Sequence, residues 1–326
     1  MGTPEVEHIP TVDEWFACWL KIREDAGCKK TTLQLYEQYY RNHVQRRFGE
    51  KRLTEVTTTE LQGFFTNLAG NYSMTYEGVR HVVSSMFCSA WKKDLVIRNP
   101  VLTVDFPKTL PAVRKRALTK EEEKHLFEYA RNSQYYDMLR LAFWTGLRIG
   151  ELSALDWCSD IDLEAGTITV RHTLDYVRGE GLILEEPKSE ASKRTIPLIG
   201  KAVRMLRKRK SRWERKVKGH NPDELPWQEC LVFTSSTGMP VHVSEVSREL
   251  KKVVQAMNRD GYTLPARFSF HVARHTFATR CLEHGMDVKV VQTLMGHAKA
   301  AMTMDTYADA LPEHQRAELN KISRWI

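Results

Sequence analysis

The stretch Phe270-His271-Val272-Ala273-Arg274-His275 holds two histidines and one arginine within six residues. His271 and Arg274 are three residues apart, so in a helix they lie on the same face. Gly296-His297 and Thr306-Tyr307 follow downstream and add a second imidazole and a phenol. Imidazole and guanidinium groups can bind a phosphate, and a phenol can attack it. The stretch predicts a site for phosphate chemistry, whose other groups must come from elsewhere in the chain.

Length and composition limit the class of protein. The chain has 326 residues, long enough for two domains with separate cores, and is 42% hydrophobic and 28% charged. No apolar run approaches the roughly 18 residues of a membrane span, and no signal-peptide pattern opens the sequence. Six scattered cysteines without a Cys-x-x-Cys pair favour free thiols in a reducing compartment. We therefore expect a cytoplasmic protein with no membrane partner.

The charge favours a polyanionic partner. The net charge is +8, with a pI near 9.1. Residues 1–116 contain 17 Lys+Arg and 13 Asp+Glu, which leaves 32 and 28 for the rest, so each part contributes +4. A basic tail would concentrate the charge, whereas an enzyme that embraces DNA from both sides would share it. An ordinary solvated basic surface explains the charge equally well.

The first hundred residues predict a bundle of four helices. Residues 1–10 contain two prolines and no periodicity, and we expect them to be disordered. Amphipathic helices are then expected from Thr11, from a cap at Thr31 or Thr32, from the capping box Thr57-x-x-Glu60, and from about Ser73. Together they predict a helical domain over residues 11–98. Its basic residues suit phosphate contacts or plain solvation equally.

Residues 99–117 form the expected linker, because they contain three prolines and the basic cluster Arg114-Lys115-Arg116. A second capping box, Thr119-x-x-Glu122, restarts helix. Further helices are expected over residues 135–146, 201–218 and 243–258, and from His271 onward with turns near Gly285, Gly296 and Pro312.

Short β-type runs separate these helices. The runs at residues 167–170, 182–184 and 194–198 are expected to form one small antiparallel sheet, and a loop from Pro222 is expected to lead into a short strand near Phe233. The second domain, residues 118–326, is therefore predicted to be mainly α with a small sheet.

Three further candidate residues come from the middle of the chain. Arg148 follows a glycine in a short turn between helical stretches, and its guanidinium can bind two phosphate oxygens at once. Glu151 could orient it, although Arg148 and Glu151 taken alone are better explained as a structural ion pair. Lys188 lies near the tip of a presumed hairpin whose other strand begins at Ser192-Lys193-Arg194. There a lysine can donate a proton, although most hairpin lysines are merely exposed.

The spacing of His271 and His275 raises the alternative of a zinc site. A metalloprotease helix has a glutamate directly after its first histidine, and here that residue is Val272, so we expect no metal. His275 is then a packed or hydrogen-bonded residue of the fold. His297 alone would be read as a helix cap, and one tyrosine among eleven as a core residue. Each of these residues alone is unspecific, and the specific signal is their order along the chain: Arg, Lys, His-x-x-Arg, Gly-His and Tyr.

That ordered set resembles the tyrosine recombinases, also called phage integrases. The matching stretches are Thr145–Leu152, Pro187–Leu198, His271–Thr279 and Leu294–His297, followed by Tyr307. The helical region before them looks like the core-binding domain of that family, so the resemblance implies a catalytic domain over residues 118–326. The chain is most similar to integrases of conjugative transposons and prophages from Gram-positive bacteria, which often begin with a further arm-binding domain.

The resemblance implies a role for each matching residue. Arg148 and Arg274 would bind the scissile phosphate, with Glu151 in support. His297 would donate a hydrogen bond to a non-bridging oxygen, and His271 would assist proton transfer from the nucleophile.

The remaining roles fall to a lysine and a tyrosine. Lys188 would protonate the leaving 5′ oxygen; we prefer it to Lys193 because it holds the place of the family's Pro-Lys-Thr/Ser, with Ser189 where many relatives have threonine. Tyr307 would be the nucleophile. Its phenol has a pKa of about 10 when unperturbed, so it needs the imidazole and the field of the arginines to lose its proton.

The implied function is site-specific recombination of double-stranded DNA for a mobile element. The protein would cut and rejoin strands through a 3′-phosphotyrosyl intermediate and a Holliday junction, as a homotetramer on core or attachment sites. No metal, ATP or other cofactor is expected, and the sequence has no Walker glycine loop. Accessory directionality or bending factors are further candidate partners. The alternatives are a Xer-type chromosome dimer resolvase and a catalytically silent DNA-binding relative.

Overall fold

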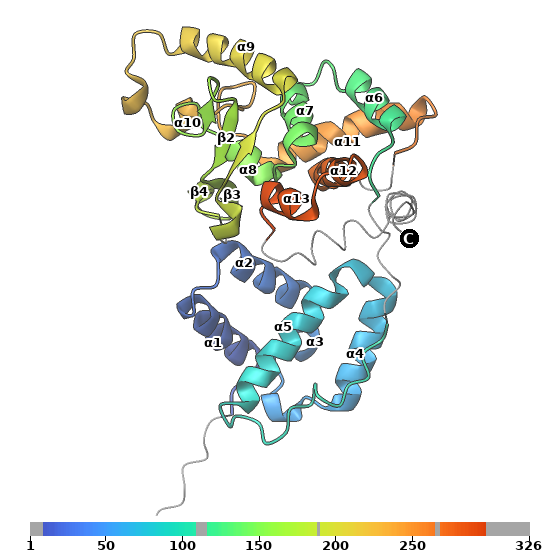
Figure 1. Ribbon diagram of the computed structural model, residues 1–326. Coiled ribbons are helices and arrows are strands. Elements are labelled where there is room, and N and C mark those ends of the chain that lie inside the picture. Colours follow the sequence, from blue (N-terminus) through green and yellow to red (C-terminus); the bar gives the residue numbers. More distant parts are fainter. Residues whose placement is uncertain (1–8, 109–115, 188–189, 265–267, 298–326) are drawn as a thin grey trace, which may run out of the picture. The chain divides into compact units, whose positions relative to one another are not determined.

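The computed structural model describes residues 9–108, 116–187, 190–264 and 268–297 (Figure 1). These residues are mostly helical, with two small antiparallel sheets, which confirms the expected fold class. The chain divides into two compact units, residues 1–112 with 177–179 and the remainder, and each has its own hydrophobic core. The domain boundaries inferred from the sequence, including the linker over residues 99–117, stay predictions.

The first unit is a helical bundle. Its elements are α1 (Val12–Asp25), α2 (Lys30–Tyr39), a π-helical turn (Tyr40–Val44), α3 (Gln45–Phe48), a 3-10 turn (Leu53–Glu55), α4 (Thr58–Asn71) and α5 (Ser73–Trp91). Thr57 caps α4 through the expected capping box, and Thr11, where the first helix was expected to begin, caps α1 through a capping box with Glu14. Aromatic side chains fill the core: the rings of Phe16 and Tyr40 stack with centroids 3.7 Å apart, which joins α1 to the π-helical turn.

The expected cap of the second helix was wrong. Lys29 is the residue before α2, and it makes no side-chain capping bond. The backbone is extended at Lys29, with ψ 141, so Thr31 and Thr32 fall inside the first turn of the helix, where their hydroxyls cannot cap it.

The second unit contains eight helices in its described part. They are α6 (Lys120–Tyr129), α7 (Tyr136–Thr145), α8 (Ile149–Ala154), α9 (Gly200–Lys216), α10 (Trp227–Cys230), α11 (Val243–Arg259), α12 (Phe270–Glu283) and α13 (Val288–Met295). This confirms the helices expected over residues 135–146, 201–218 and 243–258, and the capping box at Thr119 opens α6. Helix α12 packs against both α7 and α13. The expected turn at Pro312 lies outside the described residues.

The strands differ from the sequence prediction. Strands β1 (Ile161–Asp162), β2 (Thr167–Val170) and β5 (Arg194–Pro197) form one antiparallel sheet in the order β1-β2-β5. Strands β3 (Thr173–Val177) and β4 (Gly181–Glu185) form a separate two-stranded sheet. The single sheet expected from three runs, and the hairpin expected around Lys188, were therefore wrong.

The local turn between β3 and β4 explains this pairing. Gly179 and Gly181 both have positive φ, +91 and +86, a conformation that glycine adopts without a steric penalty. The tight turn pairs β4 with β3 directly, which leaves β5 to pair with β2. The strand β3 escaped notice because its buried residues, Leu174 and Val177, do not alternate with a period of two.

The short strand expected near Phe233 was also wrong. Residues Pro222–Glu224 form a 3-10 turn, and α10 follows directly after Pro226, whose fixed φ is compatible with the start of a helix. Leu231 makes only an isolated β-bridge with Asp156. No helix in the described ranges is both long and apolar enough to cross a bilayer.

Helix α7 ends at a glycine that has no room for a side chain. Gly146 is left-handed, with φ +67, and a Cβ built there would lie 2.5 Å from Phe277 Cδ1 and 2.9 Å from Met295 Sδ. The close approach lets α12 and α13 pack onto the turn that leads to Arg148.

We expect Gly146→Ala to lower the free energy of unfolding by about 2–3 kcal/mol, because backbone strain and overpacking add. Gly285, which follows α12, is the matched control: its φ is +82, but a Cβ there would meet nothing within 4 Å. Gly285→Ala should cost only the strain, about 1 kcal/mol. The measurement is the urea midpoint of each variant, and equal losses would contradict the steric account.

Candidate active site

Arg148 is positioned by the helix that follows it. It is the N-cap of α8, with an extended backbone at φ −70 and ψ 152. Arg148 therefore lies in the short connection between α7 and α8, where the sequence predicted it. Its backbone N–H donates to Glu151 Oε2 at 2.9 Å, and its Nη1 donates to Glu151 Oε1 at 2.7 Å. One carboxylate therefore caps the helix and orients the guanidinium.

A third group, which the sequence analysis gave no role, completes this pair. Arg194, on β5, donates from Nη1 and Nη2 to the two carboxylate oxygens of Glu151 at 3.1 and 2.9 Å. Both side chains are only 4% exposed. Arg194 Nε also donates to the carbonyl of Leu294 at 2.7 Å, which ties β5 to α13.

A signal for Arg194 is present in the sequence, in the alternation of β5. Arg194 and Ile196 are buried while Thr195 and Pro197 are exposed, so the arginine occupies a position that faces the core. A buried guanidinium requires an acidic partner. A search for that partner would have pointed to a carboxylate such as Glu151.

Arg274 approaches the same place from α12. It is 5% exposed, and its Nη1 donates to the carbonyl of Gly146 at 2.7 Å. Its Nη2 donates to the carbonyl of Met295. Both carbonyls lie at C-terminal ends of helices, α7 and α13, whose partial negative charge favours a cation.

The two arginines expected to bind phosphate lie together. Arg148 Nη2 donates to the carbonyl of Gly296 at 3.3 Å, and Arg274 donates to the carbonyl of the preceding residue, Met295. Because consecutive peptide groups hold the two guanidiniums, both can reach one anion. Burial, and next the positive charge of Arg148, lower the pKa of Arg274 to about 9.

His297 joins this cluster directly after the left-handed Gly296, which ends α13. It is 8% exposed, and its backbone is bonded in both directions to Gln292, at 3.2 and 3.0 Å. Burial lowers the pKa of its imidazole to about 4, with further contributions from Arg274 and Arg148. The ring is therefore neutral at pH 7 and can donate one hydrogen bond.

The electrostatics of the cluster favour an anion. Burial opposes the charge on Glu151, but Arg194 and Arg148 still hold its pKa below the usual value, so the carboxylate is ionised. Three guanidiniums thus surround one carboxylate beside a neutral imidazole. Burial, and next this excess positive charge, lower the pKa of Arg274 and of His297. A phosphate diester placed there would relieve that repulsion.

The other predicted residues are not part of this buried cluster, or lie outside the described residues. His271 is exposed on α12, one turn before the buried Arg274, and His275 is partly buried. Within the described ranges, no group of three or more His, Cys, Asp or Glu could hold a metal ion. Lys188 and Tyr307 lie outside the described residues. The catalytic roles of all six residues stay predictions.

Comparison with known proteins identifies the class. The phage integrase family matches residues 116–314, more than half of the chain, and the SAM-like N-terminal domain of phage integrases matches residues 11–69. The chain belongs to the phage integrase family and is a tyrosine recombinase.

The most similar relatives include both transposon and Xer proteins. A XerC-like tyrosine recombinase of Caldanaerobacter subterraneus is 28% identical over 94% of this chain and 81% of its own length. The transposase of transposon Tn916 from Enterococcus faecalis is also 28% identical, over 77% of this chain, and the chain spans 62% of that transposase.

A solved structure is similar over nearly the whole chain. The Tn1549 transposon integrase in complex with a circular intermediate DNA has a TM-score of 0.80 at 26% identity and covers 96% of this chain and 99% of its own. The expected likeness to conjugative-transposon integrases is confirmed.

We expect Arg194→Met to lower the free energy of unfolding by about 3–5 kcal/mol, because it leaves part of a buried carboxylate without its partner. The adjacent Lys193→Met is the control. Lys193 pairs with Glu186 at 3.0 Å, but the two side chains are 41% and 74% exposed, so its loss should cost less than about 1 kcal/mol. Denaturant unfolding measures both, and similar losses would show that Glu151 does not depend on Arg194.

The lowered pKa of His297 predicts a specific titration. By NMR its imidazole should titrate near pH 4, and it should move toward the ordinary 6.5 when vanadate or sulfate binds the arginines. Because the folded pKa lies below the unfolded one, the contribution of His297 to stability is complete above about pH 6.5 and is lost as the pH falls toward 4. The ring signals of His284, which is exposed, are the internal control for anion binding and should keep their chemical shifts when the anion is added at constant pH.

Proposed function

We propose that the protein is the integrase of a mobile element, which cuts and rejoins double-stranded DNA at specific sites. The observation that carries this proposal is the convergence of Arg148, Arg274 and His297 on one place, held from behind by Glu151 and Arg194. The similarity to transposon proteins, among them an integrase solved with a circular intermediate DNA, favours this substrate.

In the proposed mechanism the scissile phosphate lies against the two arginines. In-line attack by Tyr307 places negative charge on the non-bridging oxygens, where Arg148 and Arg274 stabilise it. The neutral His297 donates a hydrogen bond to one of these oxygens. His271 assists removal of the phenol proton.

The step conserves the energy of the cleaved bond. Tyr307 forms a 3′-phosphotyrosyl bond as the bond to the 5′ oxygen breaks, and Lys188 gives that leaving oxygen its proton. Attack by a 5′ hydroxyl on the phosphotyrosine reverses the chemistry. Rejoining to the strand of a partner duplex produces a Holliday junction without consuming ATP.

The proposal includes the assembly and the compartment. Four copies would act on two duplexes, with residues after about Pro312 docking on a neighbouring copy. An enzyme of this kind acts where the DNA of the cell is kept, so we place it in the cytoplasm. Six free cysteines agree with a reducing compartment.

A Xer-type resolvase is the second candidate, favoured by the XerC-like relative that matches 94% of the chain. Its substrate would be a chromosomal site and not the attachment site of an element. Recombination assays with the two kinds of DNA separate the candidates, and the DNA that flanks the gene supplies both sequences.

The nucleophile can be tested by trapping the covalent intermediate. Wild-type protein mixed with a nicked duplex that carries the attachment-site core should form a denaturant-resistant protein–DNA adduct, and Tyr307→Phe should form none, because it lacks the attacking oxygen. Tyr262→Phe, at a tyrosine that is 41% exposed, is the control and should form the adduct normally. An adduct with Tyr307→Phe would show that another residue is the nucleophile.

A further inference from the structure

A second strongly basic feature lies on the outer face of α9, distinct from the cluster around Glu151. Of the 17 residues of α9, nine are Lys or Arg and only Glu214 is acidic. Within the second unit, Figure 1 places α9 far from α13, where the arginines of the candidate active site are held. None of the residues that line this face belongs to that site.

Four cations form a single row along the helix. We call Lys201, Arg204, Lys208 and Arg212 the α9 row; all four are exposed. At 100° per residue they fall within a sector of about 80°, and at 1.5 Å per residue the row is about 16 Å long. Leu206, on the other side of the helix, is buried in the core, and Met205 is a buried residue at the edge of the row, where it lines the same hollow.

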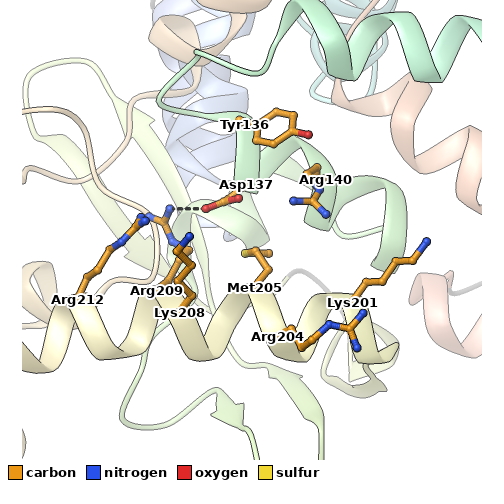
Figure 2. Close-up of a pocket in the computed structure, with 9 residues that line it drawn as sticks. All are labelled: Tyr136, Asp137, Arg140, Lys201, Arg204, Met205, Lys208, Arg209 and Arg212. Atoms are coloured by element: carbon orange, nitrogen blue, oxygen red, sulfur yellow. Dashed lines mark hydrogen bonds and ion pairs between the residues drawn. The ribbon is translucent and has the colours of Figure 1, made fainter.

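The row borders a hollow of about 390 Å³ between α7 and α9 (Figure 2). Arg140 of α7 faces it as well, so six cationic side chains line the hollow against one carboxylate, that of Asp137. That carboxylate is already engaged, because Arg209 Nη1 donates to it at 3.1 Å. The hollow therefore has a large excess of positive charge.

The side chains of the α9 row are not engaged by polar partners in the described part of the chain. None of the four makes a side-chain hydrogen bond or ion pair there. Arg204, Lys208 and Arg212 succeed one another at intervals of four, a spacing at which like charges destabilise a helix. A face kept only for solubility would intersperse both signs of charge. The arrangement is favourable only with a polyanion against it.

We propose that the α9 row binds the phosphate backbone of duplex DNA outside the segment held at the candidate active site. Duplex DNA carries about one charge per 1.7 Å of axis, so a row of about 16 Å spans roughly nine phosphates. The inference rests on the proposed function, since it takes double-stranded DNA as the substrate. An acidic protein is a poorer fit, because protein interfaces need an apolar centre and this face offers only Met205 and Tyr136.

The test compares two triple variants that each remove two lysines and one arginine. The row variant is Lys201→Ala, Arg204→Ala and Lys208→Ala. The control variant is Lys120→Ala, Lys124→Ala and Arg131→Ala, at exposed positions on and just after α6. A 30-bp duplex of arbitrary sequence is the probe, and its affinity for the full chain is measured by fluorescence anisotropy between 50 and 200 mM salt.

The row variant should bind the duplex about tenfold more weakly at 100 mM salt, and the slope of log K against log salt should flatten by roughly 2–3, as expected for three lost phosphate contacts. The control variant should change less than about twofold. A charge-retaining triple, Lys201→Arg, Arg204→Lys and Lys208→Arg, should bind like the wild type. Equal weakening by the row and control variants, or no weakening, would overturn the proposal.

Two further measurements distinguish DNA binding by the α9 row from the binding of an acidic protein and from the proposed recombinase activity. Poly-glutamate of matched charge should bind the row much more weakly than DNA does; equal affinity that the row variant abolishes would assign the row to an acidic protein and overturn the DNA proposal. Adduct formation through Tyr307 should persist in the row variant. Failure of the wild type to form the adduct would count against the proposed function alone, because anisotropy still reports on the row.

Discussion

The buried carboxylate of Glu151 is the constraint on which the rest of the site depends. It is bonded to Arg194 through both oxygens, to Arg148 through its guanidinium, and to the backbone at the start of α8. Taking these charges out of water is expensive, and the cost is offset only because every oxygen is engaged. The same carboxylate thereby joins β5 to the turn after α7, so one side chain sets both the local charge balance and the contact between these two elements.

The arginines of the cluster differ in what they face. Arg194 is buried with its partner and faces the protein, whereas the side chain of Arg148 remains one-third exposed. Arg274 and His297 are buried beside a surplus of positive charge, and both show it in a lowered pKa. A site prepared in this way stabilises an anion without rearranging when the anion arrives, which is the property that catalysis of phosphoryl transfer requires.

Sequence reasoning succeeded where a local pattern decides the structure. The capping boxes at Thr57 and Thr119 and the amphipathic periods predicted most helices, and the ordered motifs indicated the family. It failed at β4 for a local reason: the neighbouring strand β3 has no period-two pattern, so the turn of two glycines that pairs β4 with β3 was not recognised. Arg194 was missed for a different reason, since its partner Glu151 is 43 residues away in the chain.

The carbonyls of Met295 and Gly296 each hold one of the two guanidiniums expected to bind phosphate. The spacing between Arg148 and Arg274 is therefore tied to two consecutive peptide groups, whose relative orientation is set by the left-handed backbone of Gly296. A shift of α13 would move both carbonyls together. It would change the position of the bound anion and leave its contacts with the two arginines unchanged. Because one helix end holds both guanidiniums, their separation is expected to stay constant when the rest of the domain moves around α13.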